Sequence, residues 1–211
     1  MKSLSFANAD CPLCPRLVDY RNASRETWPH WHNAPVPSFG SLDAGLLIVG
    51  LAPGLRGANQ TGRPFTGDAA GDLLYPTLIK YGLAKGHYQA DPADGMVLVN
   101  CRIANAVRCV PPQNKVIAAE INACRPFLED EIAAMTELKV IVALGGVAHG
   151  AVLSVFGLKK ARHKFAHEAC HALDGGITLI DSYHCSRYNT NTGRLTEPMF
   201  HHVFARSLTY L

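Results

Sequence analysis

Short apolar runs separated by longer amphipathic stretches dominate the chain. Four runs are apolar at consecutive positions, which is typical of parallel strands buried on both faces. They span residues 46–51, 96–99, 140–144 and 177–180. Around them, the spacing of apolar residues predicts helices over residues 71–81, 117–135, 147–156 and 197–211. The alternation predicts an α/β fold, a three-layer α/β/α sandwich around a central four-stranded, mainly parallel sheet.

Glycines and polar residues follow each predicted strand. They lie at residues 50–54, 105–109, 145–146 and 184–187. Open parallel sheets bind ligands beyond the carboxyl ends of their strands, so these segments are expected to form one site. The segment that ends at Phe39 has no clear period, and we expect it to wrap around the sheet. Residues 1–211 then form a single domain.

Composition and charge narrow the class of protein only slightly. The 211 residues are 48% hydrophobic and 18% charged, as in ordinary globular proteins. The net charge of +3 with ten histidines is compatible with a polyanionic partner. The first residues lack the apolar core of a signal peptide, and no run reaches the roughly 18 apolar residues of a membrane span. We therefore expect a cytoplasmic monomer with no membrane contact.

The chain has seven cysteines, and in the reducing compartment expected for it they are better explained by metal binding or reactivity than by disulfides. Cys11 and Cys14 form a Cys-x2-Cys pair, and Cys109 and Cys124 form a second pair with fourteen residues between them. Two such pairs indicate a four-thiolate site for zinc or for an iron-sulfur cluster, which the spacing cannot separate. Packing as buried thiols is the alternative.

Several residues at the strand ends have both a structural and a functional interpretation. Phe65 lies in a glycine-rich loop that is neither a P-loop nor a dinucleotide fingerprint, and an aromatic there either packs or contacts a ligand. Asp68 precedes a predicted helix, where it could serve only as an N-cap. Asn105 offers both a donor and an acceptor, or completes a turn. A lone histidine after a strand, such as His184, is most often structural when the motif around it is not considered.

Three cysteine-containing segments resemble the cluster-binding frame of the family 4 and family 5 uracil-DNA glycosylases. They are residues 11–17 (CPLCPRL), 105–112 (NAVRCVPP) and 124–128 (CRPFL). Residues 50–68 resemble the first motif of these enzymes and residues 183–195 the second, so the resemblance spans nearly the whole chain. It implies a structural four-iron four-sulfur cluster. The ligands that it implies are Cys11, Cys14, Cys109 and Cys124.

The resemblance also implies a pocket for a flipped base. Gly50 and Ala52 belong to the first motif, where most uracil-DNA glycosylases carry a polar residue that positions water. Ala52 cannot do so, and this alanine is the mark of type B, which is family 5. The nearest carboxylate that the family pattern offers for acid-base work is Asp68.

By the same resemblance, three further residues contact the base. Phe65 stacks on it, and Asn105 pairs with the O4 and N3–H edge of uracil. His184 donates to O2, where negative charge develops as the base departs.

The loop after His184 is expected to contact DNA. Its polar residues suit phosphate binding and groove wedging, and a solvated loop is the alternative. They are Arg187, Asn189, Asn191 and Arg194. Cys185 replaces the proline that usually follows the histidine, which puts the rigidity of the loop in doubt. His163, His167 and His171 recur every fourth residue, a spacing that places them on one face of a helix or strand. A second metal site is the alternative, but only Glu168 and Cys170 could complete it, so we interpret the three histidines as surface or DNA-facing residues.

The function that this resemblance implies is DNA repair by a monofunctional glycosylase. The enzyme would flip uracil, and other deaminated bases, out of DNA and hydrolyse the N-glycosidic bond to leave an abasic site. Two alternatives remain open from the sequence. One is a glycosylase chiefly for hypoxanthine or xanthine, and the other is a non-catalytic, redox-sensing DNA-binding module.

Overall fold

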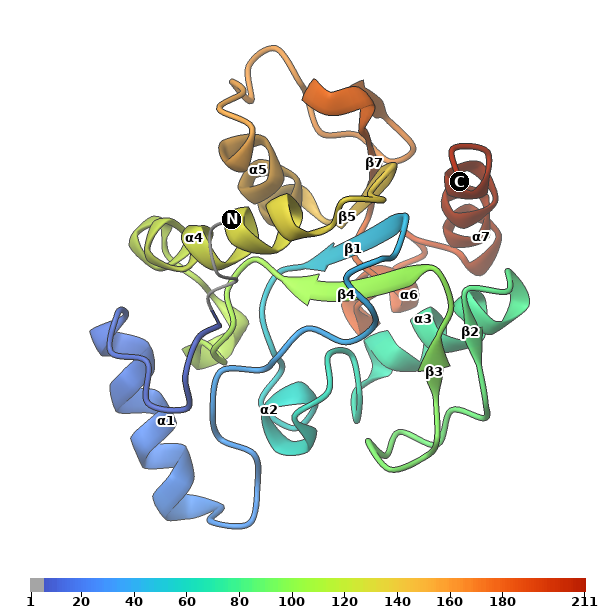
Figure 1. The fold of residues 1–211 in the computed structure, drawn as a ribbon. Coiled ribbons are helices and arrows are strands. Elements are labelled where there is room, and N and C mark those ends of the chain that lie inside the picture. The colour runs from blue at the N-terminus through green and yellow to red at the C-terminus, as the bar shows by residue number, and fades with distance from the viewer. Residues whose placement is uncertain (1–5) are drawn as a thin grey trace.

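A computed structural model describes residues 6–211 of the chain, and Figure 1 shows its fold. Helices cover both faces of a central sheet. The helices are α1 (Pro15–Thr27), α2 (Ala58–Thr61), α3 (Ala69–Lys80), α4 (Ala118–Ala134), α5 (Gly146–Val155), α6 (Arg187–Asn191) and α7 (Glu197–Leu208). The strands are β1 (Leu46–Gly50), β2 (Ala84–Lys85), β3 (Val97–Leu98), β4 (Cys101–Asn105), β5 (Val140–Leu144), β6 (Cys170–Ala172) and β7 (Thr178–Ser182). Short 3-10 turns lie at Pro112–Asn114 and Asp174–Gly176.

The central sheet has five strands in the order β4-β1-β5-β7-β6. The first four are parallel, and β6 pairs antiparallel with β7 at one edge. The α/β fold and the mainly parallel sheet are therefore confirmed, but the expected number of four strands is one too few. The additional strand, β6, has only three residues and no apolar run, so periodicity gave no signal for it.

Two hydrophobic cores hold the layers together. Side chains of β1 alternate between them: Leu46 and Ile48 pack with residues of α3 and α7, whereas Leu47 and Val49 pack with residues of α4 and α5. Figure 1 shows these helix pairs on opposite faces of the sheet. All four side chains are fully buried, and each contributes about 1.5–3 kcal/mol through removal of apolar surface from water.

The prediction of a sheet strand over residues 96–99 is wrong. Val97 and Leu98 form β3, which pairs with β2 in a separate two-stranded sheet, and Val97 is exposed. The strand beside β1 is β4, which contains the buried Arg102. This arginine donates to Glu131 of α4 and to the Gly40 carbonyl, so its charge is matched inside the protein. Because a charged residue interrupts the apolar run, the pattern of hydrophobicity concealed this strand.

The four predicted helices are confirmed, as α3, α4, α5 and α7. The N-terminal segment, by contrast, is more ordered than expected, because it contains the 13-residue helix α1. Pro15 occupies the first turn of α1, where its fixed φ and missing N–H favour a helix start. Within residues 6–211, every helix is too short or too polar to cross a lipid bilayer.

Candidate active site

The residues that sequence analysis assigned to the base pocket come together in one cavity at the carboxyl ends of β1 and β4. Ala52 and Asp68 line it, and so do the three residues expected to contact the base, Phe65, Asn105 and His184. The cavity also lies beside the end of β7, because His184 follows that strand by two residues. The parallel sheet thus gathers segments that are more than a hundred residues apart in the chain.

Gly50, the last residue of β1, lets two side chains approach the end of the strand. A Cβ atom at Gly50 would lie 2.4 Å from Asn105 Oδ1 and 2.6 Å from Phe65 Cζ, closer than any unstrained contact. Asn105 is the residue opposite Gly50 in the parallel ladder of β1 and β4. The pocket therefore requires a residue without a side chain at this position.

Asn105 has one polar atom that nothing in the described chain satisfies. Its side chain is buried, and Oδ1 has no hydrogen-bond partner among the residues of the structure. An unpaired buried acceptor costs about 1–3 kcal/mol, a cost that a bound donor would remove. The amide is thus better suited to binding a ligand than to completing a turn.

Phe65 has a strained backbone that its neighbours support. Its φ is +54°, a backbone conformation that residues other than glycine rarely adopt. The Tyr88 hydroxyl donates to the Phe65 carbonyl at 3.2 Å. Gly71 permits this approach, because a Cβ there would lie 1.9 Å from the same carbonyl oxygen. Strain held in place by such contacts is typical of binding sites.

His184 lies next to Phe65, with ring centroids 5.9 Å apart and an angle of 28° between the planes. Burial lowers the pKa of His184 to about 4, because the apolar surroundings disfavour the charged ring. The imidazole is therefore neutral at physiological pH. Asn189 of α6 donates to the His184 carbonyl at 2.8 Å, which fixes the backbone at this position.

Asp68 combines the two interpretations that the sequence left open. As N-cap of α3 it accepts a hydrogen bond from the Ala70 amide at 3.1 Å through Oδ1. Oδ2 points toward Gly54 and Gly57, on the cavity side of the loop. Burial raises the pKa of Asp68, although the helix amides oppose this shift. One carboxylate can thus cap a helix and face the pocket.

The segment expected to contact DNA forms the short helix α6 and the turn after it. Arg187, Asn191 and Arg194 are exposed, and the Arg194 guanidinium lies 4.6 Å from the centroid of the Tyr183 ring. Asn189 differs from these three residues, because its side-chain amide donates a hydrogen bond to the His184 carbonyl within the protein. Its predicted contact with DNA therefore has the least support.

The four cysteines paired by spacing also come together. Cys11, Cys14, Cys109 and Cys124 line one cavity between α1, α4 and the loop after β4. Burial raises the pKa of Cys14 to about 11 and that of Cys109 to about 12, so both thiols are protonated unless a metal displaces the proton. Cys101, by contrast, packs in the hydrophobic core.

Buried nitrogen donors surround this cysteine cluster. The Arg108 backbone N–H donates to Cys124 Sγ at 3.3 Å, and Arg21 Nη1 lies 3.9 Å from Cys109 Sγ. Arg21 is 3% exposed, and its Nε has no partner in the described chain. A buried guanidinium requires compensating negative charge, which a thiolate-bound metal cluster would supply. The residues therefore fit an anionic four-thiolate centre.

Three kinds of residue at or near these sites were not predicted from the sequence. Arg21 lies in a segment that showed no period, although Pro15 directly after Cys14 was a signal for a helix start. Tyr188 stands on α6 with 72% of its surface exposed, between two residues already expected to contact DNA. Gly71 and Tyr88 support Phe65 from positions that carry no motif.

The three evenly spaced histidines do not share one face. His171 lies on β6, whereas His163 and His167 lie in the loop before it. His167 Nδ1 accepts from the Tyr183 amide at 3.2 Å, and His171 Nε2 lies 3.1 Å from Asp181 Oδ2. The interpretation of these histidines as surface or DNA-facing residues is thus wrong for His167 and His171, whose side chains are largely buried.

Three relatives of known family are similar to this chain over most of its length. A type-5 uracil-DNA glycosylase of Thermus thermophilus is 46% identical over 196 residues, which cover 90% of this chain and 89% of the relative. A type-5 uracil-DNA glycosylase of Mycobacterium leprae is 43% identical over 203 residues, 92% of this chain and 88% of that protein. A type-4 uracil-DNA glycosylase of Pyrobaculum aerophilum is 30% identical over 181 residues, 85% and 77% of the two chains.

The fold has a solved counterpart as well. The crystal structure of wild-type SMUG2 from Pedobacter heparinus matches with a TM-score of 0.50 over 99% of this chain and 94% of that chain, at 14% identity. At this identity the match concerns the fold alone. A family model described as the uracil DNA glycosylase superfamily matches residues 37–206. With most of its length matched by that model and by relatives at up to 46% identity, the chain belongs to the uracil DNA glycosylase superfamily.

Proposed function

We propose that this protein is a DNA repair glycosylase that excises uracil, and other deaminated bases, from DNA and leaves an abasic site. The observation that carries the proposal is the convergence of Phe65, Asn105 and His184 on one cavity at the sheet's carboxyl edge. An aromatic face, an amide and a neutral imidazole supply stacking, edge recognition and leaving-group stabilisation. The names of the type-5 relatives support the same activity.

Recognition of the base is assigned to Asn105 and Phe65. The unpaired Asn105 Oδ1 would accept from uracil N3–H, while the amide nitrogen would donate to O4. Phe65 would stack on the flipped base, a contact worth about 1–3 kcal/mol in single-strand binding proteins. Since few other polar groups line the cavity, a second deaminated base that offers a similar edge would also be accepted.

Cleavage is assigned to His184. When the bond between C1′ and N1 breaks, its electron pair stays on uracil and charge develops at O2. The N–H group of a neutral imidazole can donate a hydrogen bond to this oxygen. The low pKa of His184 keeps its ring neutral at physiological pH. One such donor in an enclosed site is worth about 3–4 kcal/mol.

The water step is assigned to Asp68, because Ala52 offers no polar atom in its side chain. After uracil departs, a water molecule adds to C1′ of the sugar and loses a proton to a nearby proton acceptor. Asp68 Oδ2 faces the cavity, and its raised pKa makes the carboxylate a better proton acceptor than an exposed aspartate.

Contacts with the DNA backbone and grooves are assigned to α6 and the turn after it. Arg187, Asn191 and Arg194 would bind phosphates, with Asn189 in a lesser role because its amide holds His184. The exposed Tyr188 ring on α6 is large enough to fill the space that a flipped nucleotide leaves.

The cysteine cluster is assigned to a four-iron four-sulfur group. Its ligands would be Cys11, Cys14, Cys109 and Cys124. When bound, the group would supply structure, not chemistry on the base, because it would join α1 and α4 to the loop that follows Asn105. Arg21 and the Arg108 amide would stabilise the negative charge on its sulfurs.

The first prediction tests the activity and its main catalytic group. Cluster-loaded wild-type protein should release uracil from a duplex oligonucleotide, and His184→Ala should lower the single-turnover rate by about two orders of magnitude or more. The exposed histidine variant His202→Ala is the matched control and should keep the wild-type rate. A wild-type protein that makes no abasic sites would refute the function, whereas an active His184→Ala variant would refute only the role of His184.

The second prediction separates the two roles of Asp68. Asparagine caps a helix about as well as aspartate, so Asp68→Asn should leave the melting temperature nearly unchanged. Asparagine cannot accept a proton from water, so the single-turnover rate should fall by about two orders of magnitude. Thermal melts and quenched-flow measurements on the same sample provide the comparison. An unchanged rate would show that Asp68 only caps the helix and takes no part in the reaction.

The third prediction concerns the cysteine cluster. Anaerobically purified protein should be brown and contain about four iron and four sulfide ions per chain, a content that Cys109→Ser should lower sharply. Cys101→Ser, at the buried cysteine of β4, is the control and should retain the iron. Stoichiometric zinc without iron in the wild type would overturn the assignment.

A further inference from the structure

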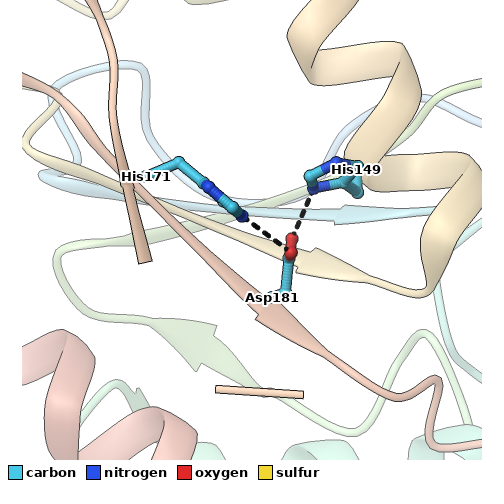
Figure 2. Close-up of side chains that lie close together, drawn as sticks. All are labelled: His149, His171 and Asp181. Carbon is cyan, nitrogen blue, oxygen red and sulfur yellow. Dashed lines mark hydrogen bonds and ion pairs between the residues drawn. The ribbon is translucent and has the colours of Figure 1, made fainter. Parts of the chain in front are cut away.

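A second set of metal-ligating side chains lies outside the base pocket and the cysteine cluster. Figure 2 shows His149, His171 and Asp181, which come from the first turn of α5, from β6 and from β7 and point toward one another. His149 Nδ1 is 2.8 Å from Asp181 Oδ1, and His171 Nε2 is 3.1 Å from Asp181 Oδ2. Asp181 is completely buried and His149 nearly so.

The contacts of His149 require a second proton on its ring or a metal ion beside it. Both ring nitrogens face oxygen acceptors, since Nε2 lies 2.8 Å from the His163 carbonyl and Nδ1 faces Asp181. A neutral imidazole carries only one N–H. The carbonyl requires that proton on Nε2, which directs the Nδ1 lone pair at a carboxylate oxygen. Two facing lone pairs at this distance are stable only when a proton or a metal ion lies with them.

The arrangement around the three side chains matches that of bound transition metals. A histidine that binds a metal through one nitrogen usually donates its other N–H to a carbonyl or carboxylate, as His149 does to His163. The donor atoms of the three residues all lie within 4.8 Å of one another, and neighbouring ligands of tetrahedral zinc lie roughly 3.4 Å apart, so small side-chain movements would bring all three to one ion. Two imidazoles and a carboxylate are a donor set that zinc accepts.

Aromatic rings surround the cluster. The Phe165 ring meets His149 edge-on at 5.7 Å between centroids, and the His163 ring meets His171 in the same way. Such surroundings limit contact with water and strengthen the attraction between a cation and the buried carboxylate. His171 retains some exposure at the edge of the sheet, so an ion can reach the site from that side.

We propose that His149 Nδ1, His171 Nε2 and the Asp181 carboxylate bind a divalent transition metal ion, of which Zn²⁺ is the representative. The ion joins α5 to the edge strand β6 and to β7. It also fixes the loop before β6 through the His163 carbonyl. Because Asp181 precedes His184 by three residues, the site stabilises the end of the strand that presents His184. The inference does not depend on the glycosylase activity.

Zinc binding by cluster-loaded, full-length protein tests this site. The protein is incubated with excess Zn²⁺, desalted and analysed for zinc and iron by mass spectrometry, and its melting temperature is recorded with and without Zn²⁺. The wild type should retain one zinc ion per chain in addition to its iron, and its melting temperature should rise by about 5 °C. The His202→Gln variant, which changes an exposed histidine, should behave in the same way.

Two variants remove ligands with little change in volume. His171→Gln and Asp181→Asn should each lose the additional zinc ion and the rise in melting temperature, while iron content and circular dichroism show that the protein is folded. The two substitutions guard against a folding defect in either one. Equal zinc uptake by these variants, or no uptake by the wild type, would overturn the proposal and leave a cluster held by protons alone.

Discussion

The base pocket depends on the absence of a side chain at Gly50. This residue ends β1 in the middle of the sheet, where β4 on one side and the glycine-rich loop on the other bring Asn105 and Phe65 to the same point. Any larger residue would displace one of them. The conformation of Phe65 depends in turn on Gly71 and Tyr88, which hold its carbonyl. A sheet edge thus becomes a pocket because two glycines allow close approach.

The cysteine cluster and the base pocket share packing contacts. Asn105 ends β4 and Cys109 lies in the loop that follows it, and Val107 between them packs with Leu17 of α1 and with Cys124 of α4. Ala52, which lines the base pocket, packs against this group as well. Ala52 therefore has two effects. It lacks a polar group that could hold a water molecule, and its methyl group adds to the apolar surface between the base pocket and the cysteine cluster.

The sequence predicted the site better than it predicted the sheet. The apolar runs of β1 and β7 identified two of the strands whose carboxyl ends carry the site, and the motifs, not the runs, identified Phe65, Asn105 and His184. Periodicity missed β4 because Arg102 is buried there, and the charge is balanced by Glu131, a residue 29 positions away that no local pattern reveals. The metal-ligating set of His149, His171 and Asp181 was missed for the same reason, since tertiary pairing alone brings these residues together.

The most direct test of this account is the Gly50→Ala variant in a single-turnover assay on uracil-containing duplex. The account predicts a folded protein with normal iron content and a rate lowered by about two orders of magnitude, because a displacement near 1 Å at the reacting base is that costly. Gly146→Ala, at the start of α5, is the matched control, since its Cβ would meet only Phe165 at 3.7 Å. A Gly50→Ala variant with the wild-type rate would contradict the account.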